Sequence, residues 1–386
     1  MKRLIVKFLI ILIVGRGSYI FCQGIPVLDL SQTIENPGNI TLSNFIESII
    51  YIPLATTYDC LVDKNPKVYV TKDYIIIITT YKCQIFSRKN GEFIREIGRY
   101  GRGPGEYQST RGLFNELIPA YYFTGWNGQL IKYTMDGVFR GNIKIPGYND
   151  SFESTSFPMN YSYFKDSVIV CDFLLATGTE PRSLMMFSEE GKVLNTVPNR
   201  NILKSKQRFT LRTGETSFYH FNNKLFFQSM YNDTVFHFSI DKVSPYLILN
   251  RGKHSPPFES RWWPYSLQTQ SGFISQPEYF ENERFISFNF QLSKNRYFAL
   301  YNKPSKLLKV AHNNSGIEND IDGFINITFD SINSEGELIG LLQANELVSW
   351  IKKNPEKFKT LNPGIQKLKN VQMEDNPVII IAKYKN

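Results

Sequence analysis

Short apolar runs separated by polar turns dominate the chain from about residue 67 onward. One unit begins with a run of four isoleucines at 75–78, continues with a second apolar run at 84–87, and turns at Asn90-Gly91 into a third run at 92–97. Asn-Gly and similar pairs between apolar runs indicate hairpins, because glycine reaches positive φ without strain. The pattern therefore predicts three consecutive antiparallel strands in this unit.

The same unit recurs four more times, with a spacing of about 45–60 residues that is typical of propeller blades. Its first apolar runs in these repeats are 120–125, 167–172, 224–230 and 284–290. An additional strand can precede the three in most units, and the candidates are 67–71, 161–164, 217–221 and Phe280. Four strands per unit predict an all-β fold, the β-propeller, rather than two stacked sandwiches, which would not explain the repeated strand order.

The sixth unit is irregular. Two predicted strands at 324–329 and 337–342 are followed by a stretch at about 345–368 with apolar residues at helical spacing, and then by a clear strand at 376–383. We therefore expect a helical insert in the last blade, which is left one strand short.

An unused apolar run near the N-terminus, Ile49–Leu54, can supply the missing strand. We predict that it is the outermost strand of blade six, beside Val378–Ala382, and that this pairing closes the ring. Closure of this kind removes two exposed sheet edges, which are a liability in any open β array. The predicted fold is a six-bladed β-propeller of four-stranded blades, closed by its N-terminal strand.

The first 22 residues resemble a secretory signal peptide, with Lys2-Arg3, an apolar stretch at 4–14 and a short polar segment at 15–18. A buried N-terminal helix or strand is the alternative. Residues 23–386 would then form the single mature domain, exported to the periplasm, the cell surface or the medium. Cys22 could instead carry a lipid anchor, but Tyr19-Ile20-Phe21 before it fits a lipobox poorly. No later run reaches the ~18 apolar residues of a membrane span.

The formal net charge is +9, and without the four basic residues of the leader it is 9 − 4 = +5. The lysines and arginines are scattered along the chain rather than clustered, which disfavours nucleic-acid binding. Three cysteines would remain after cleavage, and such a small and odd number does not form a disulfide framework. A Cys60–Cys83 bridge is an open alternative, and Cys171 is expected to be a small core residue.

Several motifs together resemble one known family. They are Pro53-Leu54 before Thr56-Thr57, Gly91-Glu92-Phe93-Ile94, Gly101-Arg102-Gly103-Pro104-Gly105-Glu106-Tyr107, and Glu374-Asp375-Asn376-Pro377. From about residue 30 to the C-terminus, the chain resembles the 6-bladed β-propeller family of exported proteins common in Bacteroidetes, which are relatives of NHL-repeat propellers. The resemblance implies the fold and an exported location, and it implies no established activity.

One face of the predicted ring carries the crossings between blades and the loops between second and third strands; we call it the long-loop face. Its longer connections are 99–112, 147–160, 200–216 and 251–281, and binding residues tend to lie on such loops. The segment 101–107 lacks the ending and context of a phosphate-binding loop, so a structural crossing is the simpler interpretation. The candidate ligand-binding residues on this face are Arg102, Glu106, Tyr107, Trp126, Arg182, Tyr231, Asp233, Arg261, Trp262, Trp263 and Arg296.

These residues mix cationic and aromatic groups, which suits an anionic or carbohydrate ligand, although burial of Trp262-Trp263 against the propeller is an alternative. No catalytic residues are assigned, because the four histidines lack metal-ligand spacing and no Gly-x-Ser-x-Gly motif occurs. The leading hypothesis is a non-catalytic binding propeller, without a cofactor, for a glycan, peptide or protein partner. The second is a hydrolase or lyase with a divalent metal bound over the central channel, held by ligands from several blades.

Overall fold

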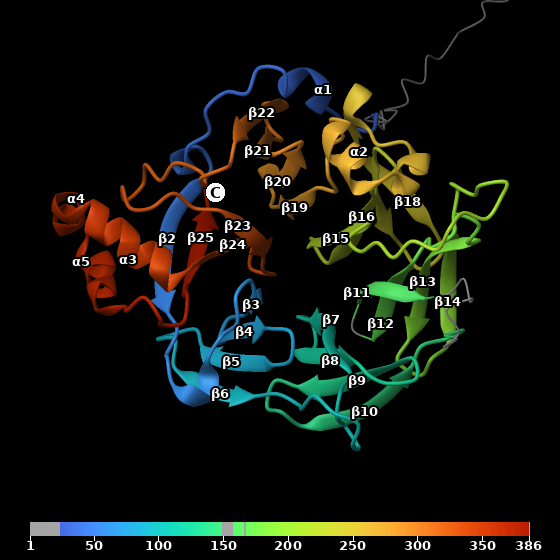
Figure 1. Ribbon diagram of the computed structural model, residues 1–386, viewed down its shortest axis with the longest axis horizontal. Coiled ribbons are helices and arrows are strands. Elements are labelled where there is room, and N and C mark those ends of the chain that lie inside the picture. The colour runs from blue at the N-terminus through green and yellow to red at the C-terminus, as the bar shows by residue number, and fades with distance from the viewer. Residues whose placement is uncertain (1–23, 149–156, 166, 386) are drawn as a thin grey trace, which may run out of the picture.

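Six four-stranded antiparallel units stand around a common axis as the blades of a propeller (Figure 1). The computed structural model describes residues 24–148, 157–165 and 167–385. The predicted leader at 1–22, with Cys22, lies outside these residues, as does part of the predicted crossing at 147–160. The six-bladed all-β fold is confirmed.

Each blade is built from strands that are consecutive in the chain, apart from the last. From the channel to the rim, the blades are β3 Lys67–Val70, β4 Tyr74–Ile78, β5 Cys83–Ser87, β6 Phe93–Glu96; β7 Ser109–Asn115, β8 Ala120–Thr124, β9 Gln129–Thr134, β10 Phe139–Lys144; β11 Pro158–Phe164, β12 Val168–Phe173, β13 Arg182–Ser188, β14 Val193–Pro198; β15 Thr216–Phe221, β16 Lys224–Ser229, β17 Thr234–Phe238, β18 Val243–Asn250; β19 Glu278–Glu281, β20 Phe285–Leu292, β21 Asn295–Asn302, β22 Leu307–His312; and β23 Phe329–Ile332, β24 Glu337–Leu342, β25 Val378–Tyr384, β2 Ile46–Pro53.

The second strand of each blade is mostly buried on both faces. In β4, the consecutive residues Ile75, Ile76 and Ile77 are all fully buried, because neighbouring blades pack against both sides of the sheet. A strand with two buried faces reads as a continuous apolar run rather than an alternating one. The rim strand β6 of the same blade is mostly exposed, and half of its residues are charged. This burial pattern explains why the middle strands are the clearest signals in the sequence.

Blade six is assembled from both ends of the chain. β2 pairs antiparallel with β25, with Tyr51 opposite Ile380 and Ile52 opposite Ile379, and β24 pairs with the other side of β25. The two strands lie side by side as the blue and red arrows of Figure 1. The predicted closure by the N-terminal strand in blade six is confirmed, and the observed strand begins three residues earlier than Ile49–Leu54.

The chain before β2 forms a strap that spans two further blades. Its first strand, β1 Val27–Asp29, pairs in parallel with β18 at the rim of blade four. The short helix α1 Leu30–Thr33 follows, Gly38 bridges to Ala311 in blade five, and the 3₁₀ turn η1 Leu42–Asn44 leads into β2. The N-terminal segment therefore connects blades four, five and six from outside, an arrangement that the sequence pattern did not predict.

Glycine is required where the first blade meets the closing strand. Gly91 has a φ of +74°, and a Cβ added there would lie 2.0 Å from the carbonyl oxygen of Pro53. The backbone of Ala55 donates to the Gly91 carbonyl at 2.8 Å. The Asn-Gly turn therefore serves two purposes, the hairpin and the close approach of β2.

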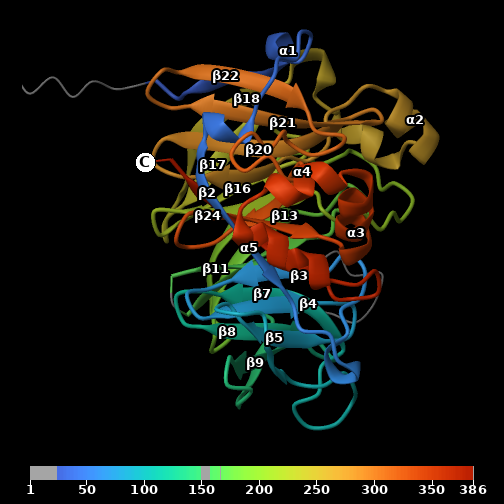
Figure 2. The same ribbon diagram turned by 90° about the vertical axis from the view of Figure 1, so that its left-hand side faces the viewer.

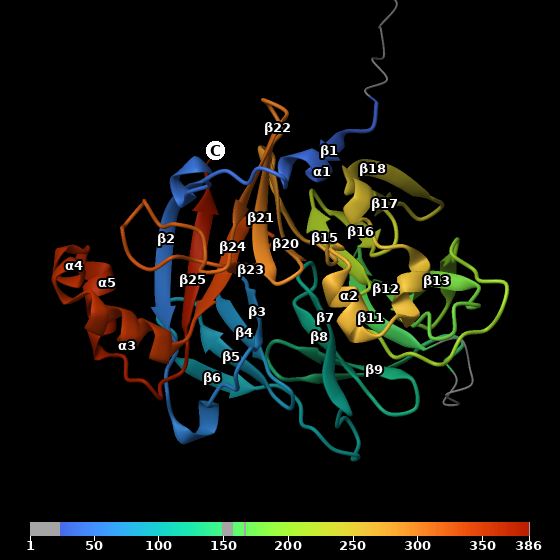
Figure 3. The ribbon, with the colours of Figure 1, turned by 45° about the horizontal axis from the view of Figure 1, so that its top comes forward.

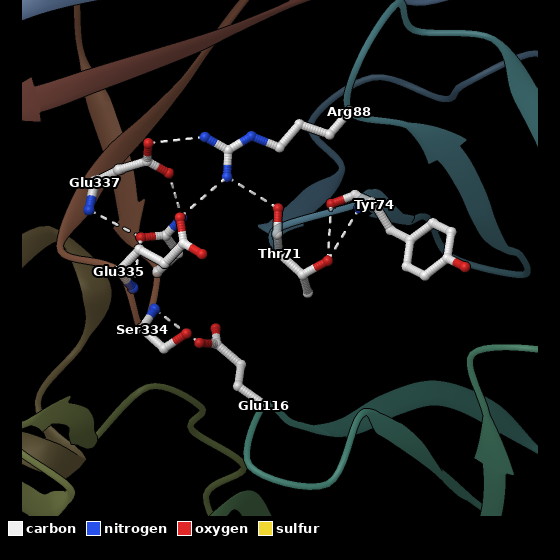
Figure 4. A network of polar contacts seen from close by, with 8 residues as sticks. Thr71, Tyr74, Arg88, Glu116, Ser334, Glu335 and Glu337 are labelled. Carbon is white, nitrogen blue, oxygen red and sulfur yellow. Dashed lines mark hydrogen bonds and ion pairs between the residues drawn. The ribbon is translucent and has the colours of Figure 1, made fainter.

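On the face opposite the long loops, a polar network connects blades one, two and six (Figure 4). Arg88, in the turn after β5, donates to Glu337 of blade six at 2.7 Å and to the Thr71 carbonyl at 3.0 Å. Glu116, in the turn after β7, accepts from the Ser334 backbone N–H at 2.7 Å, and burial raises the pKa of Glu116. These contacts connect the first two blades to the blade that closes the ring.

The predicted helical insert is confirmed between β24 and β25. It consists of α3 Ala344–Lys353, α4 Pro355–Thr360, α5 Pro363–Gln366 and the 3₁₀ turn η5 Lys367–Asn370. Leu347, Phe358 and Ile365 bury its apolar side in the core cluster of blades five and six. Figure 2 shows α3 and the short helix α2 Tyr265–Gln270 on the same side of the ring, which is the long-loop face.

Three details of the sequence interpretation are wrong. The predicted strand 324–329 is mostly loop, because Ile327 bridges back to Ile317 and β23 begins only at Phe329. The predicted crossings 99–112 and 251–281 end too late, because the first contains the start of β7, an innermost strand whose residues at 109–112 are polar or small, and the second contains all of β19. The alternative Cys60–Cys83 bridge does not form.

The three described cysteines are free, buried thiols. Cys171 is a core residue, as predicted. The remaining short turns are η2 Tyr58–Cys60, η3 Gly252–His254 and η4 Phe258–Trp262. Within the described residues, no helix is long and apolar enough to cross a membrane.

Two residues on the same face of β2 test the closure, because they lie only two positions apart but differ in burial. Ile52 is 7% exposed and packs in the core between blades six and one, whereas Ile50 is 52% exposed. We expect Ile52→Asp to lower the free energy of unfolding by about 3 kcal/mol or more, and Ile50→Asp by less than about 1 kcal/mol. Chemical denaturation of both variants measures the difference. Equally small effects would mean that β2 is a peripheral tail.

Candidate functional site

Six of the eleven candidate residues gather on the long-loop face of blades three and four. They come from the loops and strand ends of these blades and from the excursion between β18 and β19, and they are Arg182, Tyr231, Asp233, Arg261, Trp262 and Trp263. In Figure 3, α2 and the loop that follows β14 lie over this part of the ring. Tyr231, Arg261 and Trp262 are linked to one another through Glu215 and Phe258.

A pocket of about 110 Å³ opens between the two blades. Its apolar lining includes Phe173 and Val197 of blade three, and Phe227 and Phe236 of blade four. Its polar lining comes largely from strand ends and loops, and includes Asn199, Arg200, Glu215, Ser229 and Tyr231. An apolar cleft with a few polar groups is the usual form of a binding site.

A buried ion pair supports one side of the pocket. The Arg261 side chain is fully buried, and its Nε donates to Glu215 at 2.9 Å, while its Nη1 donates to the Thr210 carbonyl at 3.0 Å. The Tyr231 hydroxyl donates to the same carboxylate at 2.9 Å, and Arg212 donates to that hydroxyl at 3.0 Å. Burial raises the pKa of Glu215, and the charge of Arg261 opposes this shift.

We call residues 199–214 the arm. Backbone hydrogen bonds hold it against the loop after β12, from Leu203 to Gly178 at 2.8 Å and from Thr210 to Ala176 at 3.0 Å. A further contact is made by Trp262, whose indole N–H donates to the Arg208 carbonyl at 3.1 Å. The arm begins and ends at the pocket, because Asn199 and Glu215, which follows its last residue, both line the cavity.

The adjacent tryptophans differ in their surroundings. Trp262 is half-buried, edge-on to Phe258 and beneath the Arg261 guanidinium at 5.3 Å. Trp263 is 38% exposed and lies beside Phe273. Trp262 therefore holds the arm in place, and Trp263 presents its ring toward solvent.

Arg182 and Asp233 have different partners in this region. The Arg182 guanidinium lies 5.1 Å from the centre of the Phe173 ring, next to the pocket. Asp233 accepts from the fully buried Arg251 at 2.6 Å and from Ser255 at 3.0 Å. Arg251 therefore neutralises Asp233 within the loop that leads to α2.

Asp172 is a buried carboxyl close to the same site. It is 4% exposed and accepts hydrogen bonds from the backbone and side-chain N–H groups of Asn160 at 2.7 and 2.9 Å. Burial raises the pKa of Asp172 to about 6, despite these hydrogen bonds and a further one from Thr216, while the charge of Glu215 raises it further. The region therefore contains two carboxyl groups with raised pKa values.

Four other candidates lie over blades one and two and stabilise the crossing loop 101–107. Tyr107 is fully buried, stacks on Phe123 with ring centres 4.2 Å apart, and donates to the Tyr81 carbonyl. Glu106 accepts from the Gly103 N–H at 2.7 Å. Trp126 donates to the Gly101 carbonyl, and the exposed Arg102 lies over its ring at 4.5 Å. Ligand contact by these residues stays a prediction.

Arg296 is separate from both groups and lies near the channel, at the start of β21. It is exposed and interacts electrostatically with Glu278 and Asp330, the first residue of β19 and the second of β23. Asp330 is exposed to the channel, but the surrounding blades reduce its contact with water. This desolvation, together with the charge of Glu278, raises the pKa of Asp330 to about 6. In the described part of the chain, no three His, Cys, Asp or Glu residues are grouped so that they could hold a metal ion.

Sequence reasoning missed the residues that organise the pocket, above all Glu215 and Asp172. The only signal for Glu215 is its position as the first acidic residue after a basic stretch of sixteen positions. Asp172 ends a buried apolar run, where a carboxyl group needs a hydrogen-bond partner, but the sequence does not identify Asn160 as that partner.

Residues 25–383 match the family described as "Domain of unknown function (DUF4934)". The chain belongs to the DUF4934 family. A crystal structure of a Bacteroides fragilis protein, described as exported, is similar to this DUF4934 protein with a TM-score of 0.68 and 16% identity, over 91% of this chain and 98% of that chain. At this identity the likeness shows the fold alone.

BBS1N, solved in complex with ARL6DN, aligns with the DUF4934 chain at a TM-score of 0.35 and 10% identity, over 81% of this chain and 75% of that chain. A likeness of this size supports no argument. No curated protein matches the chain. The predicted relation to NHL-repeat propellers stays a prediction.

The raised pKa of Asp172 predicts a pH-dependent stability. Its folded-state pKa of about 6 lies above the ordinary value of 3.8, so the folded chain binds this proton more tightly than the unfolded chain. The resulting stabilisation is complete below the ordinary value and is lost as pH rises through about 6. The free energy of unfolding of the wild type minus that of Asp172→Asn should fall by up to about 3 kcal/mol between about pH 4 and pH 7.

Chemical denaturation at several pH values gives this difference, and using the difference cancels the titration of all other groups that the two proteins share. A difference that rises with pH would show a lowered pKa and contradict the buried environment of Asp172.

Proposed function

We propose that this protein is an exported, non-catalytic binding propeller that takes a peptide or protein partner through the pocket between blades three and four. The single observation that carries the proposal is the pocket itself, with its apolar lining, its polar strand-end and loop groups, and the fixed charges beside it.

An exported location is supported by two observations. The first 22 residues resemble a signal peptide, and the structurally similar Bacteroides fragilis protein is described as exported. The periplasm, the cell surface and the medium are all consistent with them.

The size of the pocket favours one anchoring group of a larger partner. About 110 Å³ is less than the roughly 300–1,000 Å³ of pockets that enclose a whole drug-sized ligand. A single side chain that fills a desolvated pocket is the usual form of an interface hot spot. The rest of the partner would then contact the loops around the opening.

The surroundings of the pocket favour a peptide over a glycan. Ile202, Leu211 and Leu267 expose aliphatic side chains on the arm and on α2. Sugars are bound by stacking on aromatic rings and by hydrogen bonds, and exposed aliphatic groups contribute to neither. Apolar side chains of a partner protein can bury these groups from water.

Filling the pocket tests the proposal. Ser229, on the wall formed by blade four, is replaced by Trp to occupy the cavity and by Ala as a matched control. Each protein is immobilised and used to select from a displayed random peptide library, in parallel with a glycan array. We expect the wild type and Ser229→Ala to enrich peptides whose affinity falls at least about tenfold on Ser229→Trp.

Ser183→Trp, from the opposite wall in blade three, is the second filling variant if the first does not fold. Circular dichroism checks the fold of each. Peptides that bind all variants equally, or no enrichment at all, would overturn the proposal. If the wild type binds glycans and no peptides, and Ser229→Trp abolishes that binding, the ligand of the pocket is a glycan rather than a peptide.

A further inference from the structure

We infer that the partner segment is acidic and lies along the arm, with the pocket receiving an apolar side chain of that segment. This inference rests on the proposed function and specifies its ligand.

The arm is strongly cationic. Residues 199–214 contain five lysines and arginines and no acidic residue. Four of them are exposed, and they are Arg200, Lys204, Lys206 and Arg208, while Arg212 is occupied by Tyr231. The expectation that basic residues are scattered along the chain is wrong for this stretch. The stretch becomes clear only when the chain is divided at the blade boundaries.

The charges are held close to the pocket rather than on a free loop. Gln207 donates to the Thr177 carbonyl at 2.9 Å, in addition to the bonds from Leu203 and Thr210 to the same loop. At one end of the arm, Arg200 itself lines the pocket, and at the other Arg261 fixes the Thr210 carbonyl. Preorganised cations beside a cavity recognise an anionic group at a small cost in conformational entropy.

Apolar side chains lie between these cations. Phe209 is 48% exposed and Leu211 64% exposed on the arm itself, and Trp263 adds an aromatic ring from the neighbouring excursion. A partner that combines carboxylates with apolar side chains complements this surface in both respects. An acidic polysaccharide would match only the charge.

The helical insert provides an internal comparison. It is also basic, with six lysines between residues 344 and 370, but it contains Glu346 and Glu356 as well. Among the exposed large apolar side chains of the described chain, none belongs to the insert at 344–370. The insert therefore carries positive charge without exposed large apolar side chains, whereas the arm combines positive charge with exposed apolar groups and a pocket.

An anionic membrane is the other surface that cationic and apolar groups can bind. A bilayer presents no side chain that would occupy a pocket, whereas the arm begins and ends at one. A protein partner is therefore the occupant that accounts for the cations, the exposed apolar side chains and the pocket together.

Two variants with the same change in charge test the inference. In the first, Arg200, Lys204, Lys206 and Arg208 are replaced by Glu; in the second, Lys352, Lys353, Lys367 and Lys369 of the insert are replaced by Glu. All eight side chains are exposed. Both are used in the random-peptide selection together with the wild type and Ser229→Trp, and phosphatidylglycerol vesicles are tested by co-sedimentation.

We expect the wild type and the insert variant to enrich peptides that combine Glu or Asp with an apolar residue. The arm variant should bind these peptides at least about tenfold more weakly, and the affinity of the wild type should fall with added salt. Retention of the peptides by the arm variant, or equal loss in both charge variants, would overturn the inference.

Peptides without an excess of acidic residues that are still lost on Ser229→Trp would overturn the inference while leaving the proposed function intact. Vesicle binding that the arm variant loses, without acidic peptides, would make the surface a membrane contact instead. No selection by any variant would contradict the proposed function itself.

Discussion

The pairing of β2 with β25 is the interaction on which the rest of the structure depends. A ring of blades has no natural end, and without β2 the last blade would present the unpaired edge of β25, a strand that is almost entirely buried. Because β2 comes from the beginning of the chain and β25 from its end, this one ladder converts a linear array of blades into a closed ring. The strap from β1 through α1 strengthens the same closure by attaching the N-terminal segment to blades four and five.

A closed ring allows the long-loop face to hold features that would otherwise be costly. Arg251 and Arg261 are fully buried cations, and each is tolerated because a carboxylate and backbone carbonyls lie within hydrogen-bond distance. These pairs fix the excursion between β18 and β19 over blades three and four. The excursion, in turn, holds the arm through Trp262, so that the pocket and its cations are positioned by the scaffold rather than by local loop structure.

How much of this could be predicted from the sequence depends on burial. Strands such as β4 and β12 are buried on both faces and appear as continuous apolar runs, so blade number, closure and insert follow from the pattern. Innermost strands such as β7 and β23 are short or begin with polar and small residues, and they were missed or misplaced. Their position at the channel allows polar side chains that the apolar pattern does not reveal.

The candidate site was predicted in part for a similar reason. Unusual composition directed attention to Arg261-Trp262-Trp263, and two of these residues do support the site, since Arg261 pairs with the pocket residue Glu215 and Trp262 holds the arm. Their partners, Glu215 and the arm, are about fifty positions earlier in the chain, and no local pattern specifies such a pairing. Tyr107 shows the opposite case, because a motif that is distinctive in sequence folds its aromatic ring into the core.

The most direct test of the account is native-state hydrogen exchange of the closing strand. The backbone amides of β2 that bond to β25 should exchange with the same free energy of opening as the amides of β25, because both are released only when the ring opens. If the β2 amides exchange at a much lower free energy while β25 stays protected, the strand is a fraying appendage, and the ring does not depend on it.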